Sequence, residues 1–323
     1  MNASMRQQNN HPGKTVGLLA LLLAAAVVLS VLAGRYPLGM DGIREVILYI
    51  RLPRIAMACL VGCGLSAAGA AYQGVFQNPL AAPDILGATQ GAAFGAALAI
   101  LAGLSSQWIT LVSFACSLAA VSIVWFIGRR TAGKRVLGLI LTGIMIGSLF
   151  SAGTSFVKLV ADPADQLPAI TYWLMGSLAG IGRDNVLQAS LPMLLGLLPL
   201  FVLRWRINLM TLGDEAAQSL GVDTDRMRKL IVAGSTLITA AAVSATGMIG
   251  WVGLVVPHLA RKLIGNDYRY LMPGSMLLGA LFLLLVDNVA RSALSREIPI
   301  GILTAFVGAP FFLYLITRGG EKH

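Results

Sequence analysis

The stretch RIAMACLVGCGLSAAGAAYQGVF (residues 54–76) decides the class of fold. After the opening arginine it contains no charged residue, and alanine and glycine make up much of it. A helix needs about 20 residues to cross a hydrocarbon core of roughly 30 Å, and backbone groups in lipid must be hydrogen-bonded internally. The stretch is therefore predicted to be a transmembrane helix.

Nine further apolar runs have the same character, so the chain is expected to be an all-α integral membrane protein with ten transmembrane helices. The composition agrees, since 57% of the residues are hydrophobic and only 12% are charged, whereas soluble domains carry about 25% charged residues. The runs are 16–34, 54–76, 85–103, 108–128, 136–158, 186–203, 229–250, the short 252–264, 272–292 and 299–317.

The distribution of lysine and arginine indicates the orientation of these helices. With the N-terminus inside, the cytoplasmic segments hold twice as many lysines and arginines as the outer segments, as the positive-inside rule requires. This bias accounts for the net charge of +10 without a nucleic-acid partner. We expect residues 16–318 to form one transmembrane domain between two cytoplasmic tails, residues 1–15 and 319–323.

Residues that carry chemistry are sparse. Cys59, Cys63 and Cys116 lie in apolar runs and the three histidines do not cluster, so neither a metal site nor a catalytic group is predicted. His258 is expected to pack within its helix. Asp287 is the one acid inside an apolar run, and acids in that position are candidates for proton coupling or for a contact between helices.

Small residues recur at every fourth position along several runs, a pattern that lets helix backbones approach closely in lipid. The pattern predicts a tightly packed bundle. One such stripe consists of Gly62, Ser66, Ala70 and Gly74.

One polar segment interrupts the apolar pattern. GDEAAQSLGVDTDR (residues 213–226) places four acids among fourteen residues. It is expected to leave the bilayer on the cytoplasmic side and to form one or two short helices separated at Gly221. Asp214 and Glu215 suit a helix N-terminus, where the helix dipole favours negative charge. An apolar face at helical spacing is offered by Leu212, Ala216, Ala217 and Leu220. The segment is either a docking element for a cytoplasmic partner or a solvated loop.

The segment GDEAAQSLGV, together with four others, resembles the FecCD-type permeases, which are membrane subunits of ATP-binding cassette (ABC) importers for iron-siderophores, haem and cobalamin. The four others are IRLPRIAMACLVGCGLSAAGAAYQGVFQNPLAAPDILG (50–87), TYWLMGSL (171–178), GMIGWVGLVVPHLAR (247–261) and EIPIGILTAFVGAPFF (297–312). The resemblance covers nearly the whole chain. It implies the type II ABC importer permease fold in a dimer, placed in the bacterial inner membrane with both termini in the cytoplasm.

The resemblance also implies partners. These are a second permease subunit, identical or closely related, two cytoplasmic ATPase subunits, and one periplasmic or lipoprotein substrate-binding protein. No G-x-x-x-x-G-K-[ST] motif occurs in this chain, so ATP must be hydrolysed by another polypeptide. The chain is thus expected to be a transporter subunit, not an enzyme, and to bind no cofactor directly.

Three groups of site residues follow from the resemblance. The ATPase-coupling segment, residues 212–228, would use Gly213, Asp214, Glu215, Ala216, Ala217, Leu220 and Gly221. In the turn QNPLAAPD (77–84), Asn78 and Leu80 would belong to the cytoplasmic gate. Arg51, Arg54 and Arg291 would pair with acids of the binding protein, with Arg296 a weaker candidate. We expect Arg51 and Arg54 to face water. On the residues alone, the gate segment is equally a plain turn and the arginines are equally interface anchors.

The expected function is passage of an iron-siderophore complex, or of a related iron chelate, haem or cobalamin; oxyanion importers share this architecture. The first alternative is an ion-coupled secondary transporter in which Asp287 carries the proton. The second is a membrane enzyme, which would need a cluster of histidines, cysteines or acids that the sequence lacks.

Overall fold

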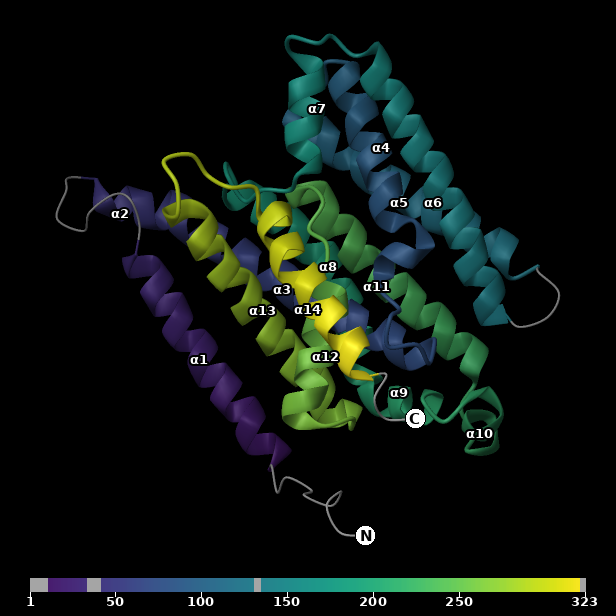
Figure 1. Cartoon of the computed structure of the whole chain (residues 1–323). Coiled ribbons are helices and arrows are strands. Elements are labelled where there is room, and N and C mark those ends of the chain that lie inside the picture. The colour runs from purple at the N-terminus through teal and green to yellow at the C-terminus, as the bar shows by residue number, and fades with distance from the viewer. Residues whose placement is uncertain (1–10, 34–41, 131–134, 320–323) are drawn as a thin grey trace.

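The computed structural model describes residues 11–33, 42–130 and 135–319, and these residues form helices and connecting turns without a strand (Figure 1). The outermost parts of the two expected tails, residues 1–10 and 320–323, lie outside this range. The elements are α1 (Pro12–Leu32), α2 (Ile43–Val46), the π-helix η1 (Ile47–Arg51), α3 (Leu52–Val75), the 3-10 helix η2 (Pro83–Leu86), α4 (Ala88–Leu101), α5 (Ser106–Gly128), α6 (Arg135–Val160), α7 (Gln166–Leu174), α8 (Arg183–Val202), α9 (Arg204–Met210), α10 (Asp214–Ser219), α11 (Thr224–Thr246), α12 (Val252–Ile264), α13 (Tyr268–Ser292) and α14 (Ile300–Gly319).

Each of the ten predicted runs corresponds to a helix. Seven helices of the described chain are long and apolar enough to cross a membrane, and one of them extends unbroken from α2 through η1 to the end of α3. The others are the shorter α4, α12 and α14. The prediction of a ten-helix membrane protein is therefore confirmed.

Three local details differ from the sequence prediction. The run 85–103 is broken at Gly87, whose φ of 77° lies in the left-handed region, so α4 begins only at Ala88. The helix α9, directly after α8, lies outside the predicted runs. The short helix α7, between α6 and α8, was not anticipated.

Helix α3 lies in the middle of the bundle. Every residue from Gly64 to Val75 is buried, and α3 packs against α8, α11, α12 and α13. The close approaches that the small-residue stripe predicts are present. A Cβ atom on Gly62 would collide with the backbone carbonyl of Gly279 on α13. Gly69, which lies outside the stripe, approaches α12 as closely, because a Cβ atom there would collide with the backbone of Gly253.

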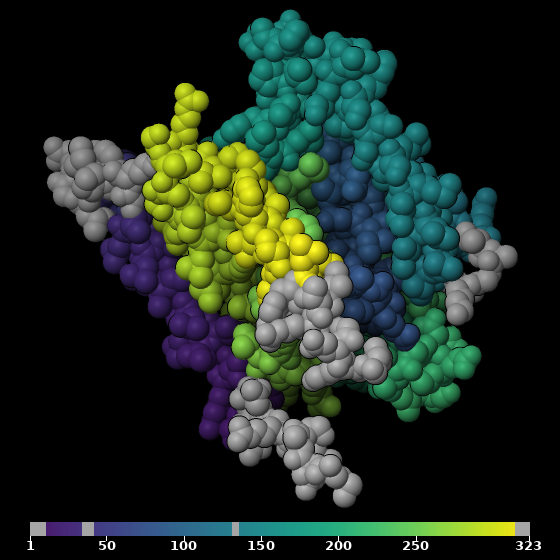
Figure 2. Space-filling view, in the orientation of Figure 1, coloured from purple at the N-terminus to yellow at the C-terminus, as the bar shows by residue number. Residues whose placement is uncertain are grey.

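The helices run between two ends of the molecule that carry different elements. Helices α9 and α10 lie at the end where α1 begins and α14 ends, which we call the α10 end (Figure 1). Helices α2 and α7 lie at the opposite end, the α2 end, where the teal segment around α7 projects beyond its neighbours (Figure 2). Each end carries one of the two polar regions described below.

Candidate functional site

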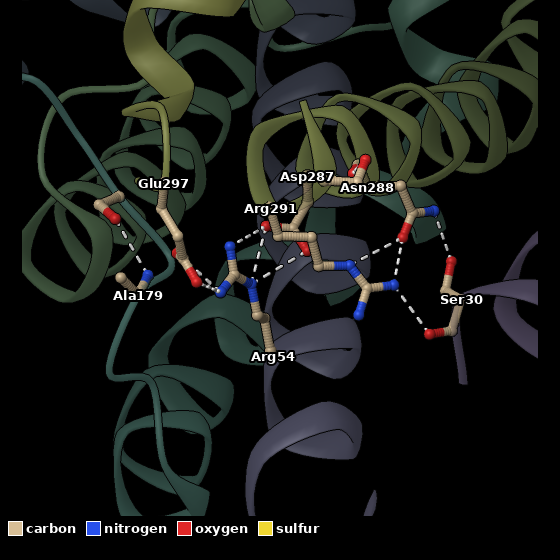
Figure 3. Close-up of polar contacts among 9 residues, drawn as sticks. Ser30, Arg54, Ala179, Asp287, Asn288, Arg291 and Glu297 are labelled. Carbon is tan, nitrogen blue, oxygen red and sulfur yellow. Dashed lines mark hydrogen bonds and ion pairs between the residues drawn. The ribbon is translucent and has the colours of Figure 1, made fainter. Parts of the chain in front are cut away.

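A charged cluster joins three segments at the α2 end (Figure 3). Arg54 on α3 donates from Nε to Asp287 Oδ1 and Oδ2 on α13, at 2.9 and 3.1 Å. Its Nη1 donates to Glu297 Oε1 and Oε2, both at 2.9 Å, on the segment that leads into α14. Arg54 is 8% exposed and Asp287 is 0% exposed. Since one guanidinium holds two carboxylates from distant segments, the cluster fastens α3, α13 and the start of α14 together.

The expectation that Arg51 and Arg54 face water is wrong. Arg51 is only 4% exposed, and its Nη1 donates to the carbonyl oxygen of Val31 at 2.7 Å. The reason is that the chain is already helical from Ile43, so the two arginines lie within a continuous helix instead of at its outer tip. The contact between helices expected for Asp287 is confirmed by its pairing with Arg54.

Arg291 connects α13 to α1. Its Nη2 donates to the carbonyl oxygen of Ser30 at 2.8 Å, and its Nε donates to Asn288 Oδ1 at 3.1 Å. Asn288 in turn donates from Nδ2 to the hydroxyl of Ser30 at 2.6 Å (Figure 3). Arg291 is half-buried, whereas Arg44 and Arg296 are exposed at the same end. The α2 end therefore combines a buried, internally paired set of arginines with an exposed set.

At the α10 end, the polar segment forms α10 and the start of α11. Asp214 and Glu215 begin α10, as predicted, and Gly221 lies in the break between the helices with a φ of 82°. Arg228 on α11 is 2% exposed and donates from Nη2 to both carboxylate oxygens of Asp214, at 2.8 and 2.9 Å. This ion pair fixes α10 against the membrane-spanning α11.

The predicted position of Ala217 on the docking face is wrong. Ala217 is 0% exposed, because the chain turns back after α10 and the backbone N–H of Val222 donates to the carbonyl of Ala217 at 3.0 Å. A helix of six residues that packs on its own chain must bury one side, and Ala217 lies on that side. The exposed side consists of Leu212, Glu215, Ala216 and Leu220, with Leu212 at 62% and Leu220 at 59% exposure.

The turn that contains Asn78 and Leu80 is attached to this segment. Gln77 donates from Nε2 to the carbonyl oxygen of Met210, the last residue of α9, at 3.0 Å. Gln77 has a φ of 50°, a conformation that residues other than glycine seldom adopt. The backbone N–H of Leu80 donates to Asn78 Oδ1 at 2.9 Å, and the Leu80 side chain is 50% exposed. The α3–η2 turn is thus in direct contact with the end of α9, just before α10 begins.

A second network at the α10 end joins α3, α9, α12 and α13. Arg261 on α12 donates to the side chains of Gln73 and Tyr268, and the Tyr268 hydroxyl donates to the carbonyl of Ala70 at 2.9 Å. Asn208 on α9 donates to Asp267 at 2.7 Å. Slight burial of the Asp267 carboxylate raises its pKa. Two hydrogen bonds, from the Arg269 backbone N–H and the Asn208 amide, and the positive charge of Arg269 have the opposite effect. Together they outweigh the effect of burial and hold the pKa of Asp267 below its usual value.

Sequence reasoning missed several residues of these networks. The Arg54–Asp287 pair could have been predicted. An arginine or an acid alone in an apolar run costs free energy, and two opposite charges in separate runs reduce that cost by pairing. Glu297 and Gln77 gave no comparable signal, because both occur next to turns where polar residues are ordinary. His258 packs edge-on to Phe311, with ring centroids 6.4 Å apart. Within the described ranges, no group of three or more His, Cys, Asp or Glu residues could hold a metal ion.

Comparison with known proteins gives a consistent result. The chain is 39% identical to the molybdate import system permease protein MolB of Haemophilus influenzae, over 97% of this chain and 99% of MolB. It is 41% identical to a Helicobacter pylori protein named "Probable iron chelatin transport system permease protein", over 84% and 82% of the two chains. Other relatives are named as permeases for cobalamin in Halobacterium salinarum and for hemin in Yersinia pestis.

A solved structure agrees with these relatives. An inward-facing ABC transporter described as being of the metal-chelate type matches this fold with a TM-score of 0.89 and 40% identity, over 95% of this chain and 99% of the other. The FecCD transport family matches residues 19–318. The chain therefore belongs to the FecCD transport family, and it is a multi-pass membrane permease subunit of an ABC importer.

Proposed function

We propose that this subunit carries an iron chelate, such as an iron-siderophore complex, across the bacterial inner membrane. It would act with a second permease copy, two ATPase subunits at the α10 end and a substrate-binding protein at the α2 end. Both termini would lie in the cytoplasm. The 41% identity to the iron chelatin permease of Helicobacter pylori supports an iron chelate as the cargo.

The observation that carries the coupling part of this proposal is the contact between Gln77 and Met210. The exposed side of α10 offers two leucines and the acidic Glu215 to a partner, and Arg228 holds α10 to α11 through Asp214. A displacement of α10 by the ATPase would therefore be transmitted to the α3–η2 turn through the hydrogen bond between Gln77 and Met210. This arrangement supports Asn78 and Leu80 as parts of a cytoplasmic gate that responds to the ATPase.

Helix α6 supports passage of a bulky cargo. One side of it is exposed and carries Ser148, Ser151, Ala152 and Ser155 without a charged group. The hydroxyls of Ser148 and Ser155 donate to the carbonyls four residues earlier, at 2.8 and 3.0 Å. Hydroxyls that already donate within their own helix have little left to offer a cargo, so recognition would belong to the binding protein.

The burial of Arg54 changes the role proposed for the outer arginines. Docking of the binding protein would involve the exposed Arg296 and the half-buried Arg291 directly. Arg51 and Arg54, each held by its own chain, would keep the docking surface in shape. A carboxylate of the binding protein could reach Arg54 only by displacing Glu297, whose side chain is 31% exposed.

Molybdate is a second candidate cargo, because the alignment with MolB covers nearly the whole of both chains. Uptake into proteoliposomes that contain the complete importer decides between the two. We expect accumulation of a radioactive iron chelate, dependent on ATP and on the binding protein. Accumulation of radioactive molybdate, with no iron chelate taken up, would replace the iron assignment by the oxyanion one.

A further inference from the structure

A wide apolar groove of about 860 Å³ lies on the side of the bundle, lined by α1, α3, α8 and α13. Apart from the thiols of Cys59 and Cys63, its lining side chains are hydrocarbon or thioether. Five leucines on α8 line it, and four of them, Leu191, Leu194, Leu195 and Leu198, are each more than half exposed. In a membrane-spanning bundle, an apolar groove of this size must be filled by something equally apolar.

The groove opens toward the α10 end along α8. There it extends from Leu191 to Phe201, which at 1.5 Å per residue is roughly 15 Å, about half of a hydrocarbon core of roughly 30 Å. Phe201 is followed directly by α9, so this end of the groove lies at the α10 end. Along α3 the lining continues to Ala56, two residues from Arg54. An acyl chain that enters beside Phe201 therefore has room along its whole length.

A fixed positive charge lies at the inner end of the groove. The guanidinium of Arg204 lies over the ring of Phe201, 4.1 Å from its centroid, and its Nη1 donates to the carbonyl of Phe201 at 2.7 Å. Among the residues that the structure describes, no carboxylate forms an ion pair with Arg204. The next arginine, Arg206, instead lies over Trp205, 5.3 Å from its ring. A tryptophan between two arginines is typical of the level at which lipid headgroups lie.

We propose that this groove is a binding site for an anionic phospholipid of the cytoplasmic leaflet. One acyl chain fills the groove between α1 and α8, and the phosphate lies against Arg204. The apolar lining accounts for the chain, and the charge of Arg204 beside Phe201, at the α10 end, accounts for the headgroup and for the leaflet.

The test uses photo-crosslinking in nanodiscs that hold the permease with its ATPase. Phosphatidylglycerol or phosphatidylcholine with a diazirine in the same acyl chain is added to a phosphatidylcholine bilayer, and crosslinked peptides are identified by mass spectrometry. We expect phosphatidylglycerol to mark residues 56–63 and 191–201 about fivefold more than phosphatidylcholine does, the preference expected for one basic residue at an anionic surface.

Two matched pairs of variants separate the headgroup from the chain. Arg204→Gln should abolish the preference for phosphatidylglycerol, whereas Arg206→Gln, which removes the same charge two residues away, should retain it. Ala56→Trp should fill the groove from an exposed position and reduce its labelling, whereas Ile123→Trp, on the exposed side of α5, should not.

Three results would overturn the proposal. The first is equal labelling by the two lipids in the unaltered protein. The second is an equal effect of Arg204→Gln and Arg206→Gln. The third is an efficient disulfide between the Cys59 residues of two permease copies in a variant without Cys63 and Cys116, which would show that a second copy covers the groove.

Discussion

At the scale of single residues, the arrangement around Arg54 shows how a charge is accommodated inside a membrane protein. Arg54 is held by Asp287, which has no exposed surface, and by Glu297, whose side chain is 31% exposed. The two carboxylates therefore differ in what their removal costs. A buried charge left without its partner is strongly destabilising, whereas a partly exposed pair contributes little because water screens it.

Replacement of Asp287 by Asn should lower the free energy of unfolding by roughly 3–5 kcal/mol, because the guanidinium of Arg54 loses its fully buried counter-ion. Glu297→Gln is the matched control and should lower it by about 1 kcal/mol or less. Thermal unfolding in detergent measures both. Equal losses for the two variants would show that the burial of Asp287 does not govern the strength of the cluster.

Gln77 is the second residue with a separable role. Gln77→Gly should keep or slightly raise the stability, since glycine adopts a φ of 50° without strain, but it removes the hydrogen bond to Met210. We expect fewer cargo molecules imported per ATP hydrolysed, with the ATPase still bound. Unchanged uptake per ATP would mean that the turn and α9 are not coupled through this bond.

At the scale of elements, the short helix α10 has one solvent-exposed face and one buried face. Its outside carries Glu215, Ala216 and, next to the helix, Leu220, and its inside carries Ala217. The ion pair between Asp214 and Arg228 sets which side faces out, because it fixes the rotation of α10 relative to α11. Adjacent alanines in this helix therefore differ in function.

Ala216→Arg and Ala217→Arg should fail in different ways. The first places a long cation on the exposed side and should reduce copurification of the ATPase while leaving the permease stable. The second buries an unpaired charge, which should lower the stability of the permease itself by several kcal/mol. Pull-down of the ATPase and thermal unfolding distinguish the two. A stable Ala217→Arg protein that loses only the ATPase would place Ala217 on the docking face after all.

At the scale of the whole molecule, the two polar ends are separated by an apolar bundle. Among the residues that the structure describes, Asp287 is the acid without exposed surface, and it is paired with Arg54. An acid held in this way is a poor proton carrier, because protonation would leave the arginine unpaired. Energy is therefore expected to enter at the α10 end, where the exposed residues proposed to dock the ATPase lie, rather than through a proton that crosses the bundle.

Proteoliposomes test this expectation. Uptake should require the ATPase, ATP and the binding protein together, and it should continue when a protonophore collapses the proton gradient. Uptake by this chain alone, driven by an imposed proton gradient and lost on Asp287→Asn, would contradict the ATP-driven mechanism.

Features that depend on hydropathy and residue spacing could be predicted from the sequence. Features that depend on the rotation of a helix about its axis, or on how far a helix extends beyond its apolar run, could not. The ten spans and the close approach at Gly62 follow from apolar length and small-residue spacing. The burial of Ala217 depends on how far α10 is rotated, and that is set by the distant Arg228. The burial of Arg51 and Arg54 depends on the helical extension through α2 and η1, which hydropathy alone does not reveal.

The Arg54 cluster has a consequence for how the protein is made. Arg54 and Asp287 are separated by 233 residues. At roughly 5–20 residues per second, a ribosome needs on the order of 10–50 s to synthesise the stretch between them. During that interval α3 is already in the membrane without the acid that its arginine requires. The newly made helix must therefore wait at a shallow depth, or beside the insertion machinery, until α13 emerges. A chain that terminates before α13 would expose an unpaired arginine to lipid and be a natural substrate for membrane proteases.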